Sequence, residues 1–492
     1  MAERAAQVRS MKAIYEGAVR IYGWLGLPHD NEEARAAVVI MRECNKYLRE
    51  GLRDNNDDIM MVFSKITSDL ACFPHDAQSE LGWAGIARIC DSPFWRRAWI
   101  YQEVSTPTKI SFWYGHHDFD DVLVNAVATM AINFAKLPGF PENIAKSCGH
   151  GSGAYSMIDA RNRRENGQNL SFAELMQEMR VADCTDLRDR VYCLLAHTSD
   201  VPAGRFNIDY QIDPMELFVD VARYLITESK GGLEIFRYVF TPTAESTQEA
   251  FRARFQPSLP SWVPDWRQKV YLDSAFGHFT MTADDGLPLY TPLSGPVRVR
   301  VESSQLHVQG LVMRDTEITL LTNIWDDYNR SWQAPLKWYN DLLADFGSCP
   351  SVDMAIRRSM LGNRTFFKED HHWVQYKYRR GGLLDWQVIE ATSSVPDPSS
   401  PTRPAYMFAD FYNVCYGRRL AVLDHRRIAV VPAGATIGDK IAAFQGGHSL
   451  YLLRPLHDDH FQFIGECYVD GWMNGEIAHE KAEGIVRTIR LV

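Results

Sequence analysis

Hydrophobic and polar positions follow a helical period at the start of the chain, interrupted by one short apolar run. Residues 6–18 and 31–52 carry apolar side chains at the spacing of a helix face. Residues 19–26 form the apolar run between them, and glycine and proline end it. The pattern predicts helix, strand and helix. The expected buried face of the first helix comprises Gln7, Met11, Ile14, Tyr15 and Ala18.

A further helical pattern starts at Ser92, a residue type that caps helices, and continues into a predicted strand at residues 109–115. Trp99 and Gln102 fall on one face of this helix, with Glu103 beside them. A carboxylate next to an indole, where a helix leads into a strand, is a candidate site of chemistry in an α/β protein. The alternative is a core tryptophan and a solvated or salt-bridged glutamate, and the pattern by itself favours this alternative.

The number of strands near the N-terminus is too small for a complete parallel sheet. Only residues 19–26 and 109–115 predict strands before residue 120. Two strands do not make a stable sheet, and a parallel sheet needs helices on both faces. We therefore expect residues 1–118 to be a partial α/β domain without its first strands. A truncated sequence or an incomplete gene model explains this, and strands donated by a partner are a third alternative.

The middle of the chain, residues 119–285, is expected to be mainly helical. The clearest helical patterns cover residues 120–137, 171–180, 186–195 and 215–225. Residues 259–266 contain two prolines and cannot form a regular helix. They predict a rigid aromatic connector that includes Trp262, Asp265 and Trp266.

After about residue 290 the pattern changes to alternation of apolar and polar residues. Residues 296–301 and 305–308 predict a hairpin. Further strands are expected at residues 427–431, 440–445, 449–454 and 461–469. Short strands separated by glycine and proline are typical of a small antiparallel barrel or sandwich. Residues 286–492 are therefore expected to be β-rich, with a helical insertion near 325–346 and a mobile, proline-rich loop at 391–404.

Composition is that of a soluble globular protein of two or three domains: 492 residues, 46% hydrophobic and 23% charged. The net charge of −10 argues against a nucleic-acid partner, because phosphate binding needs clustered Lys and Arg. No apolar stretch has the length of a membrane span, and the N-terminus has no apolar signal core. Nine cysteines without a Cys-x-x-Cys pair predict reduced, mostly buried thiols and a cytoplasmic protein.

Other clusters of polar residues favour structure over chemistry. The charges of Asp186, Arg188, Asp189 and Arg190 can neutralise one another, and we expect them to link the helical region to the α/β part. Residues 148–153 are glycine-rich but follow no clear strand, which disfavours a phosphate loop. Residues 457–460 fit a solvated hairpin loop better than a metal site, so no metal is expected.

Several of these segments resemble one known family, the fungal heterokaryon-incompatibility (HET) domain and the region that follows it. Gln7, Met11, Tyr15 and Trp24 are similar to the middle of that domain, and residues 97–103, with Arg97 and Gln102, are similar to its closing Arg-x-Trp-x-x-Gln-Glu motif. The downstream matches are 186–192, 209–210, 259–266, 434–441, 453–455, 465–469 and 471–476. The family's opening Leu-Ser-Tyr-x-Trp-Gly and Cys-Ile-Asn-Gln segments have no counterpart here, which implies an incomplete HET domain.

The resemblance implies a role in non-self recognition between hyphae and in programmed cell death, with protein partners or self-association. HET domains are similar to Toll/interleukin-1 receptor (TIR) domains, so the implied fold is a partial, TIR-like parallel α/β sheet, followed by a helical region and a β-rich region. Some TIR domains cleave NAD with a helix glutamate. By this similarity Glu103 is the candidate catalytic residue, Trp99 shapes the pocket or the core, and NAD is the implied substrate.

The chemistry implied by this similarity is plausible for a carboxylate, which stabilises the oxocarbenium character that develops when a ribosyl–nicotinamide bond breaks. The loops of the first strands, which such a site needs, are absent from the sequence. We therefore expect no catalysis by this chain and no bound cofactor. An NAD-cleaving effector that uses Glu103 and a non-catalytic interaction scaffold are the alternatives.

Overall fold

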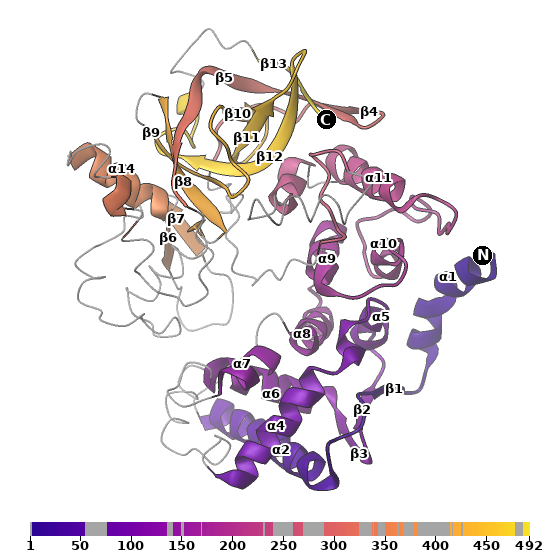
Figure 1. Cartoon of the computed structure of the whole chain (residues 1–492). Coiled ribbons are helices and arrows are strands. Elements are labelled where there is room, and N and C mark those ends of the chain that lie inside the picture. Colours follow the sequence, from indigo (N-terminus) through magenta and orange to yellow (C-terminus); the bar gives the residue numbers. More distant parts are fainter. Residues whose placement is uncertain are drawn as a thin grey trace. The chain divides into compact units, whose positions relative to one another are not determined.

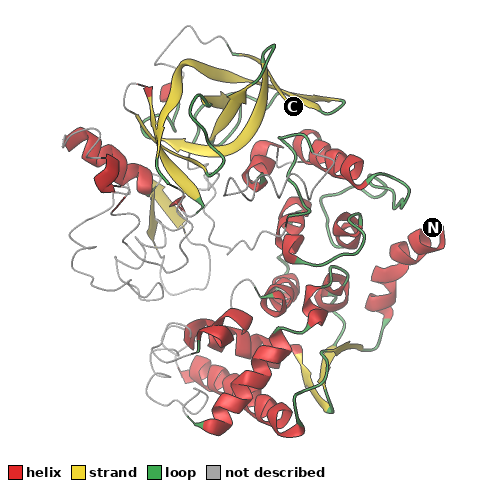
Figure 2. Cartoon of the chain, viewed as in Figure 1, coloured by secondary structure: helices red, strands yellow, loops and turns green. Residues whose placement is uncertain are grey.

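The computed structural model divides the chain into two compact units. The first unit comprises Met1–Pro214 and Trp266–Ser274, and the second comprises Met215–Asp265 and Ala275–Val492. Helices predominate in the first unit and strands in the second (Figure 2). The structure describes residues 2–54, 76–134, 141–148, 152–168, 170–229, 232–239, 259–268, 290–323, 337, 339–342, 350–361, 364–367, 377–380, 414–415, 417–424, 427–477 and 486–492.

The first unit begins with the helix–strand–helix order that the sequence pattern predicts. Its first elements are α1 (Ala2–Gly17), β1 (Ile21–Trp24), α2 (Asn31–Asp54), α4 (Ala77–Cys90), η1 (Pro93–Arg96), α5 (Ile100–Ser105), β2 (Ile110–Tyr114) and β3 (His117–Asp120). The buried face of α1 differs from the expected one. Ala5 and Val8 are buried, whereas Gln7 is exposed and Ile14 is 62% exposed. The prediction failed because α1 packs mainly against the short helix α5, so only a narrow stripe is covered.

A three-stranded sheet lies at one side of this unit, in the order β1-β2-β3 (Figure 1). β1 runs parallel to β2, with Ile21 opposite Ile110, and β2 runs antiparallel to β3. The sequence-based count of two strands is therefore wrong by one. β3 was missed because Phe119 is its only apolar residue. Gly115 makes the tight turn before it, with a φ of +59° that favours glycine.

Helices cover one face of this sheet. Ile21, Phe112 and Phe119 are buried on the face that α2 and α6 (Asp121–Phe134) pack against. α4 lies against α2, where a Cβ on Gly82 would be only 2.6 Å from the Ile40 side chain. The opposite face of the sheet carries exposed aromatic residues, among them Trp24. A parallel strand pair with one open face departs from the usual two-sided cover of parallel sheets.

The segment predicted as one helix from Ser92 to Glu103 is interrupted. Ser92 and Pro93 begin the 3₁₀ turn η1, as their residue types predict. The backbone then extends at Arg97, with φ −79° and ψ 129°, and α5 begins only at Ile100. Arg97 forms a β-bridge with Asp183, and the Ala98 N–H donates to the Asp183 carbonyl at 2.9 Å. This long-range bridge overrides the local helical pattern.

Five further helical elements complete the part of the first unit that the structure describes, and two helical elements begin the second. The first set is α7 (Glu142–Cys148), α8 (Gly153–Glu165), α9 (Phe172–Glu178), η2 (Met179–Val181) and α10 (Asp189–Leu195). The second set is α11 (Pro214–Thr227) and η3 (Gly232–Tyr238). Residues 259–268 contain no regular helix, as their prolines predict, and Trp262 and Trp266 are both buried.

The second unit is built on an eight-stranded sheet. Its strands are β4 (Val299–Glu302), β5 (Gln305–Leu321), β8 (Arg418–Leu423), β9 (Arg427–Pro432), β10 (Lys440–Phe444), β11 (Leu450–Pro455), β12 (His460–Val469) and β13 (Arg487–Leu491). The helix α14 (Pro350–Met360) and the pair β6 (Arg364–Phe367) and β7 (Lys377–Arg380) accompany it. The predicted hairpin at 296–308 and the four predicted strands after residue 427 are confirmed.

The sheet closes on itself as a barrel (Figure 1). β5 pairs with β13 at one end, with β10 in its middle and with β8 at its other end. β12 pairs with β11 along one edge, and with β13 and β9 along the other. The antiparallel barrel is thus confirmed, except that β12 and β13 are parallel. The predicted loop at 391–404 lies outside the described residues, as does the helix near 325–346 apart from residues 337 and 339–342.

Candidate functional site

The candidate carboxylate Glu103 lies on α5, half-buried and facing α1. The Tyr15 side chain of α1 lies beside it, and the Arg97 guanidinium contributes a favourable charge. Burial raises the pKa of Glu103 above its usual range, and Tyr15 and Arg97 reduce that shift. Burial and the neighbouring carboxylate raise the pKa of Tyr15 to about 12. Three residues singled out from the sequence, Tyr15, Arg97 and Glu103, are therefore brought together.

The two neighbours of Glu103 in the motif have different surroundings. Gln102 is fully buried, and its Nε2 donates to the Cys193 carbonyl at 2.8 Å. Within the described part of the chain, its Oε1 accepts no hydrogen bond. Trp99 is half-buried and stands at the start of α5 without a capping side-chain bond. Gln102 thus fixes α5 to α10. Glu103 therefore remains the candidate catalytic residue of the motif.

A buried arginine holds the loop that follows α5. Arg161 of α8 donates through Nη1 to the carbonyl oxygens of Val104, Thr106 and Thr108, at 3.0, 2.6 and 3.2 Å. Its Nε donates to Asp121 at 2.6 Å. No sequence pattern indicates this role, because the run of basic residues around 161–164 has the pattern of a solvated helix face. These four partners lie 40 residues or more away in the chain, and Arg161 also pairs with Glu165 one turn later in α8 at 3.0 Å.

The charged segment before α10 forms an ionic link to α1. Arg4 pairs with Asp186 at 3.2 Å and with Asp189 at 2.9 Å, and its guanidinium stacks 3.8 Å from the centroid of the Tyr210 ring. Tyr210 in turn donates to Asp189 at 2.6 Å. Burial acts to raise the pKa of Asp186, but its bonds with Arg188 and the charge of Arg4 outweigh burial and lower it. The expected link between the helical region and the N-terminal part is present.

The two arginines of this segment were expected to neutralise its two carboxylates. They also bind backbone carbonyl oxygens. Arg188 bonds to Asp186 but also donates to the Ile212 carbonyl at 2.9 Å. Arg190 is buried and donates to the carbonyl oxygens of Met179 and Arg180. The Asp186–Arg190 segment therefore organises the surrounding backbone, and the cation that pairs with Asp189 comes from α1.

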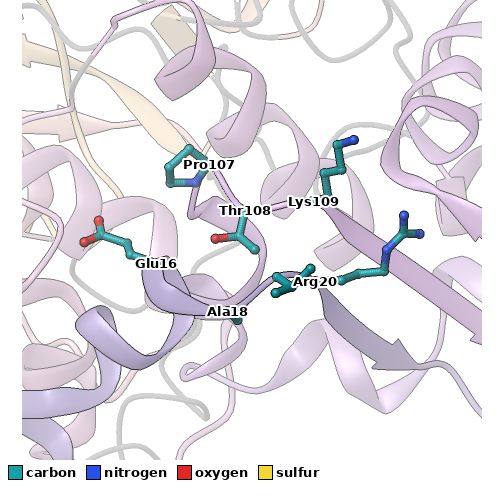
Figure 3. A pocket seen from close by; sticks show the side chains of 7 residues that line it. Glu16, Ala18, Arg20, Pro107, Thr108 and Lys109 are labelled. Atoms are coloured by element: carbon teal, nitrogen blue, oxygen red, sulfur yellow. The ribbon is translucent and has the colours of Figure 1, made fainter.

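An open pocket of about 500 Å³ lies where α1 ends and β1 and β2 begin (Figure 3). Its lining is Glu16, Ala18, Val19, Arg20, Pro107, Thr108 and Lys109. Arg20 and Lys109 extend on the opposite side of it from Glu16. The Thr108 hydroxyl donates to the Tyr15 carbonyl at 2.8 Å. Neither Glu103 nor Trp99 lines this pocket. The pocket and the candidate carboxylate are therefore separate features.

The remaining residues singled out from the sequence differ in how far they are buried. Met11 is half-buried on α1, and Trp24 is 54% exposed on β1. Trp262 is buried and its Nε1 donates to the Ser304 carbonyl at 2.9 Å. Asp265 is half-buried beside the buried Trp266. One of the boundaries between the two units falls between Asp265 and Trp266.

Three further findings concern metal ligands, cysteines and membrane-spanning helices. Among the described residues, no three His, Cys, Asp or Glu side chains come together as metal ligands. Seven cysteines lie in the described ranges without a disulfide among them, and six are buried, which agrees with the prediction that most of the thiols are buried. The helices in the described ranges are too short or too polar to cross a membrane.

Comparison with known proteins gives matches at both ends of the chain. Residues 1–103 match the family "Heterokaryon incompatibility protein (HET)", and residues 405–484 match the "Het-6 beta-barrel domain". The chain is also similar to "Heterokaryon incompatibility protein 6, OR allele" of Neurospora crassa, with 21% identity over 97% of this chain and 79% of the relative. No solved structure matches the chain. The first match ends at Glu103 and the second spans β8 to β12, so both segments of the chain are similar to heterokaryon incompatibility (HET) proteins of fungi.

Proposed function

We propose that this chain acts in non-self recognition between fungal cells, that it triggers growth arrest and cell death, and that it does so through protein association rather than catalysis. The observation that carries the proposal is the similarity over nearly the whole chain to a heterokaryon incompatibility protein. Both matched segments occur in one chain, the HET segment before the barrel. We further propose that the protein acts in the cytoplasm.

The surroundings of Glu103 support the non-catalytic part of the proposal. Its carboxylate lies beside Tyr15 of α1 and close enough to Arg97 to be influenced by the guanidinium charge. A carboxylate that stabilises an oxocarbenium ion needs a free face toward the sugar. In this arrangement Glu103 joins α1 to α5, which is a structural role.

Expression in Neurospora crassa strains that carry different heterokaryon incompatibility alleles tests the proposed function. We expect growth arrest and uptake of a vital dye in at least one tester strain, and normal growth with a frameshifted copy of the same transcript. The Glu103→Gln variant should arrest growth as the unmodified chain does. Normal growth in every tester strain at confirmed expression would contradict the proposal.

The second candidate function is TIR-like cleavage of NAD. Two observations favour it: the position of Glu103 at the end of the HET match, and its half-buried carboxyl with a raised pKa. Incubation of the purified chain with NAD, with nicotinamide measured by chromatography, separates the two functions. Turnover that is lost in Glu103→Gln but kept in Glu16→Gln would establish the NAD-cleaving alternative, because Glu16 lines the nearby pocket.

A further inference from the structure

One backbone edge of β1 has no partner strand. Within the described residues β1 forms a ladder with β2 only. The Ile21 N–H donates to the Lys109 carbonyl and the Leu25 N–H donates to the Trp113 carbonyl, both at 2.9 Å. Successive residues of a strand point their N–H and C=O groups to opposite edges. The backbone groups of the even-numbered residues of β1 therefore point away from the sheet.

The open edge is continuous with an exposed aromatic face. Tyr22 is 65% exposed, Trp24 54% and Trp113 37%, and the register of β1 and β2 places Trp24 beside Trp113. Val19 and Leu27 flank β1 and are 96% and 77% exposed. Large exposed apolar residues concentrated on one strand mark an interaction surface, and an open strand edge offers hydrogen bonds to another strand.

We propose that the β1 edge pairs antiparallel with β1 of a second copy of this chain, which joins two three-stranded sheets into one of six strands. A twofold axis at Gly23 places Tyr22 of each copy opposite Trp24 of the other. Both residues direct their backbone groups outward, so each such pair exchanges two N–H···O=C bonds. The aromatic side chains then meet as cross-strand pairs on the exposed face.

The residue at the proposed axis fits this arrangement. Gly23 faces the buried side of the sheet, where a Cβ would lie 2.6 Å from the Phe112 ring. The position is thus restricted to glycine by the core of its own unit. In the antiparallel register it becomes a pair without hydrogen bonds, in which the two backbones approach most closely.

Charge complementarity favours a second copy over an unrelated strand. Arg20 and Lys109 are exposed at the start of β1 and β2, and in the described part of the chain neither forms an ion pair. Two exposed acidic residues follow the end of β1. Asp30 directly precedes α2, and Glu32 lies in its acidic first turn. Antiparallel pairing brings the basic end of one copy toward the acidic end of the other. Parallel pairing would bring like charges together.

This inference extends the proposed function by naming the partner and the surface of association, and it is tested in solution without a fungal host. Sedimentation of the purified full chain from below 1 µM to about 100 µM should show a concentration-dependent dimer. The double variant Tyr22→Lys with Trp24→Lys places like charges directly opposite each other. We expect it to raise the dimer dissociation constant by about 100-fold or more.

A matched control carries two lysines at exposed apolar positions elsewhere, Val122→Lys with Ile437→Lys, and should dimerise as the unmodified chain does. Circular dichroism confirms that each variant is folded. The register is tested by mixing Tyr22→Cys with Trp24→Cys under mild oxidation, which should give the mixed disulfide in preference to either homodimer.

Two results would overturn the inference. One is a monomer over the whole concentration range, which would leave the proposed fungal function untouched. The other is a dimer whose stability is the same in the β1 double variant and in the control, which would place the interface elsewhere. Growth arrest that fails in the host while the dimer forms would instead contradict the proposed function alone.

Discussion

Replacing Arg161 by methionine tests whether one buried guanidinium holds the C-terminal end of α5. Met has nearly the length of the Arg161 stem but none of its donors. The change leaves the Asp121 carboxylate, which is 18% exposed, without its 2.6 Å partner. It also removes the Nη1 donor shared by the carbonyl oxygens of Val104, Thr106 and Thr108.

The magnitude follows from the burial of the partners. Each buried acceptor that loses its donor costs about 1–3 kcal/mol, and removal of one member of a buried ion pair costs about 3–5 kcal/mol. These costs overlap, because they describe the same guanidinium, so we expect about 3–5 kcal/mol for Arg161→Met. Arg163→Met on the same helix is the control. Arg163 is 34% exposed, and loss of its pairs with Asp159 and Glu178 should cost about 1 kcal/mol or less.

Hydrogen exchange by mass spectrometry measures this change within the first unit, since a chain of two units does not unfold as one two-state transition. Peptides covering α5 and β2 should lose protection in Arg161→Met and keep it in Arg163→Met. Equal loss in the two variants, or a loss below about 1 kcal/mol for Arg161→Met, would refute the assignment of Arg161 as the support of this loop.

Three further changes have defined outcomes. Burial and nearby cations lower the pKa of His197 from 6.5 to about 3, so the unfolded chain binds a proton in this range that the folded chain does not. Stability should therefore fall as the pH drops from 6.5 towards 3, and thermal unfolding at several pH values should show a weaker dependence in His197→Gln. Gly23→Ala should destabilise by about 1–3 kcal/mol by clashing with the Phe112 ring, whereas Gly17→Ala, with no atom within 4 Å of its Cβ, should change the unfolding free energy by less than about 1 kcal/mol. Arg4→Ala should cost about 1–3 kcal/mol because the buried Asp189 loses its cation, and limited proteolysis should then cut α1 faster than in Arg9→Ala.

Sequence reasoning located best the elements in which the spacing of apolar residues matches the positions that are buried. The barrel strands after residue 427 alternate or are continuously apolar, and their core residues such as Ile441, Leu452 and Ile464 are fully buried. β3 was missed because a strand with one apolar residue has no detectable period. The interruption at Arg97 was missed because its cause, the bridge with Asp183, is distant in the sequence.

The candidate site could be predicted only in part for the same reason. Arg97, Tyr15 and Glu103 were each singled out, yet their meeting depends on how α1 packs against α5. The guanidinium of Arg161 supports that region through partners that no local pattern connects to it. Residue types and spacing therefore indicate which side chains are candidates, and packing decides which of them meet.

Most of the strands that pair with β5 are synthesised after it. Of the four strands that pair with β5 in the described residues, β4 precedes it, whereas β8, β10 and β13 all leave the ribosome after β5, and β13 leaves last. The apolar ladder of β5 thus emerges long before the strands that will cover it, which is the situation in which nascent chains aggregate or recruit chaperones. A messenger RNA that ends before β13 would yield a chain in which the first part of β5, the longest strand, permanently lacks its β13 partner.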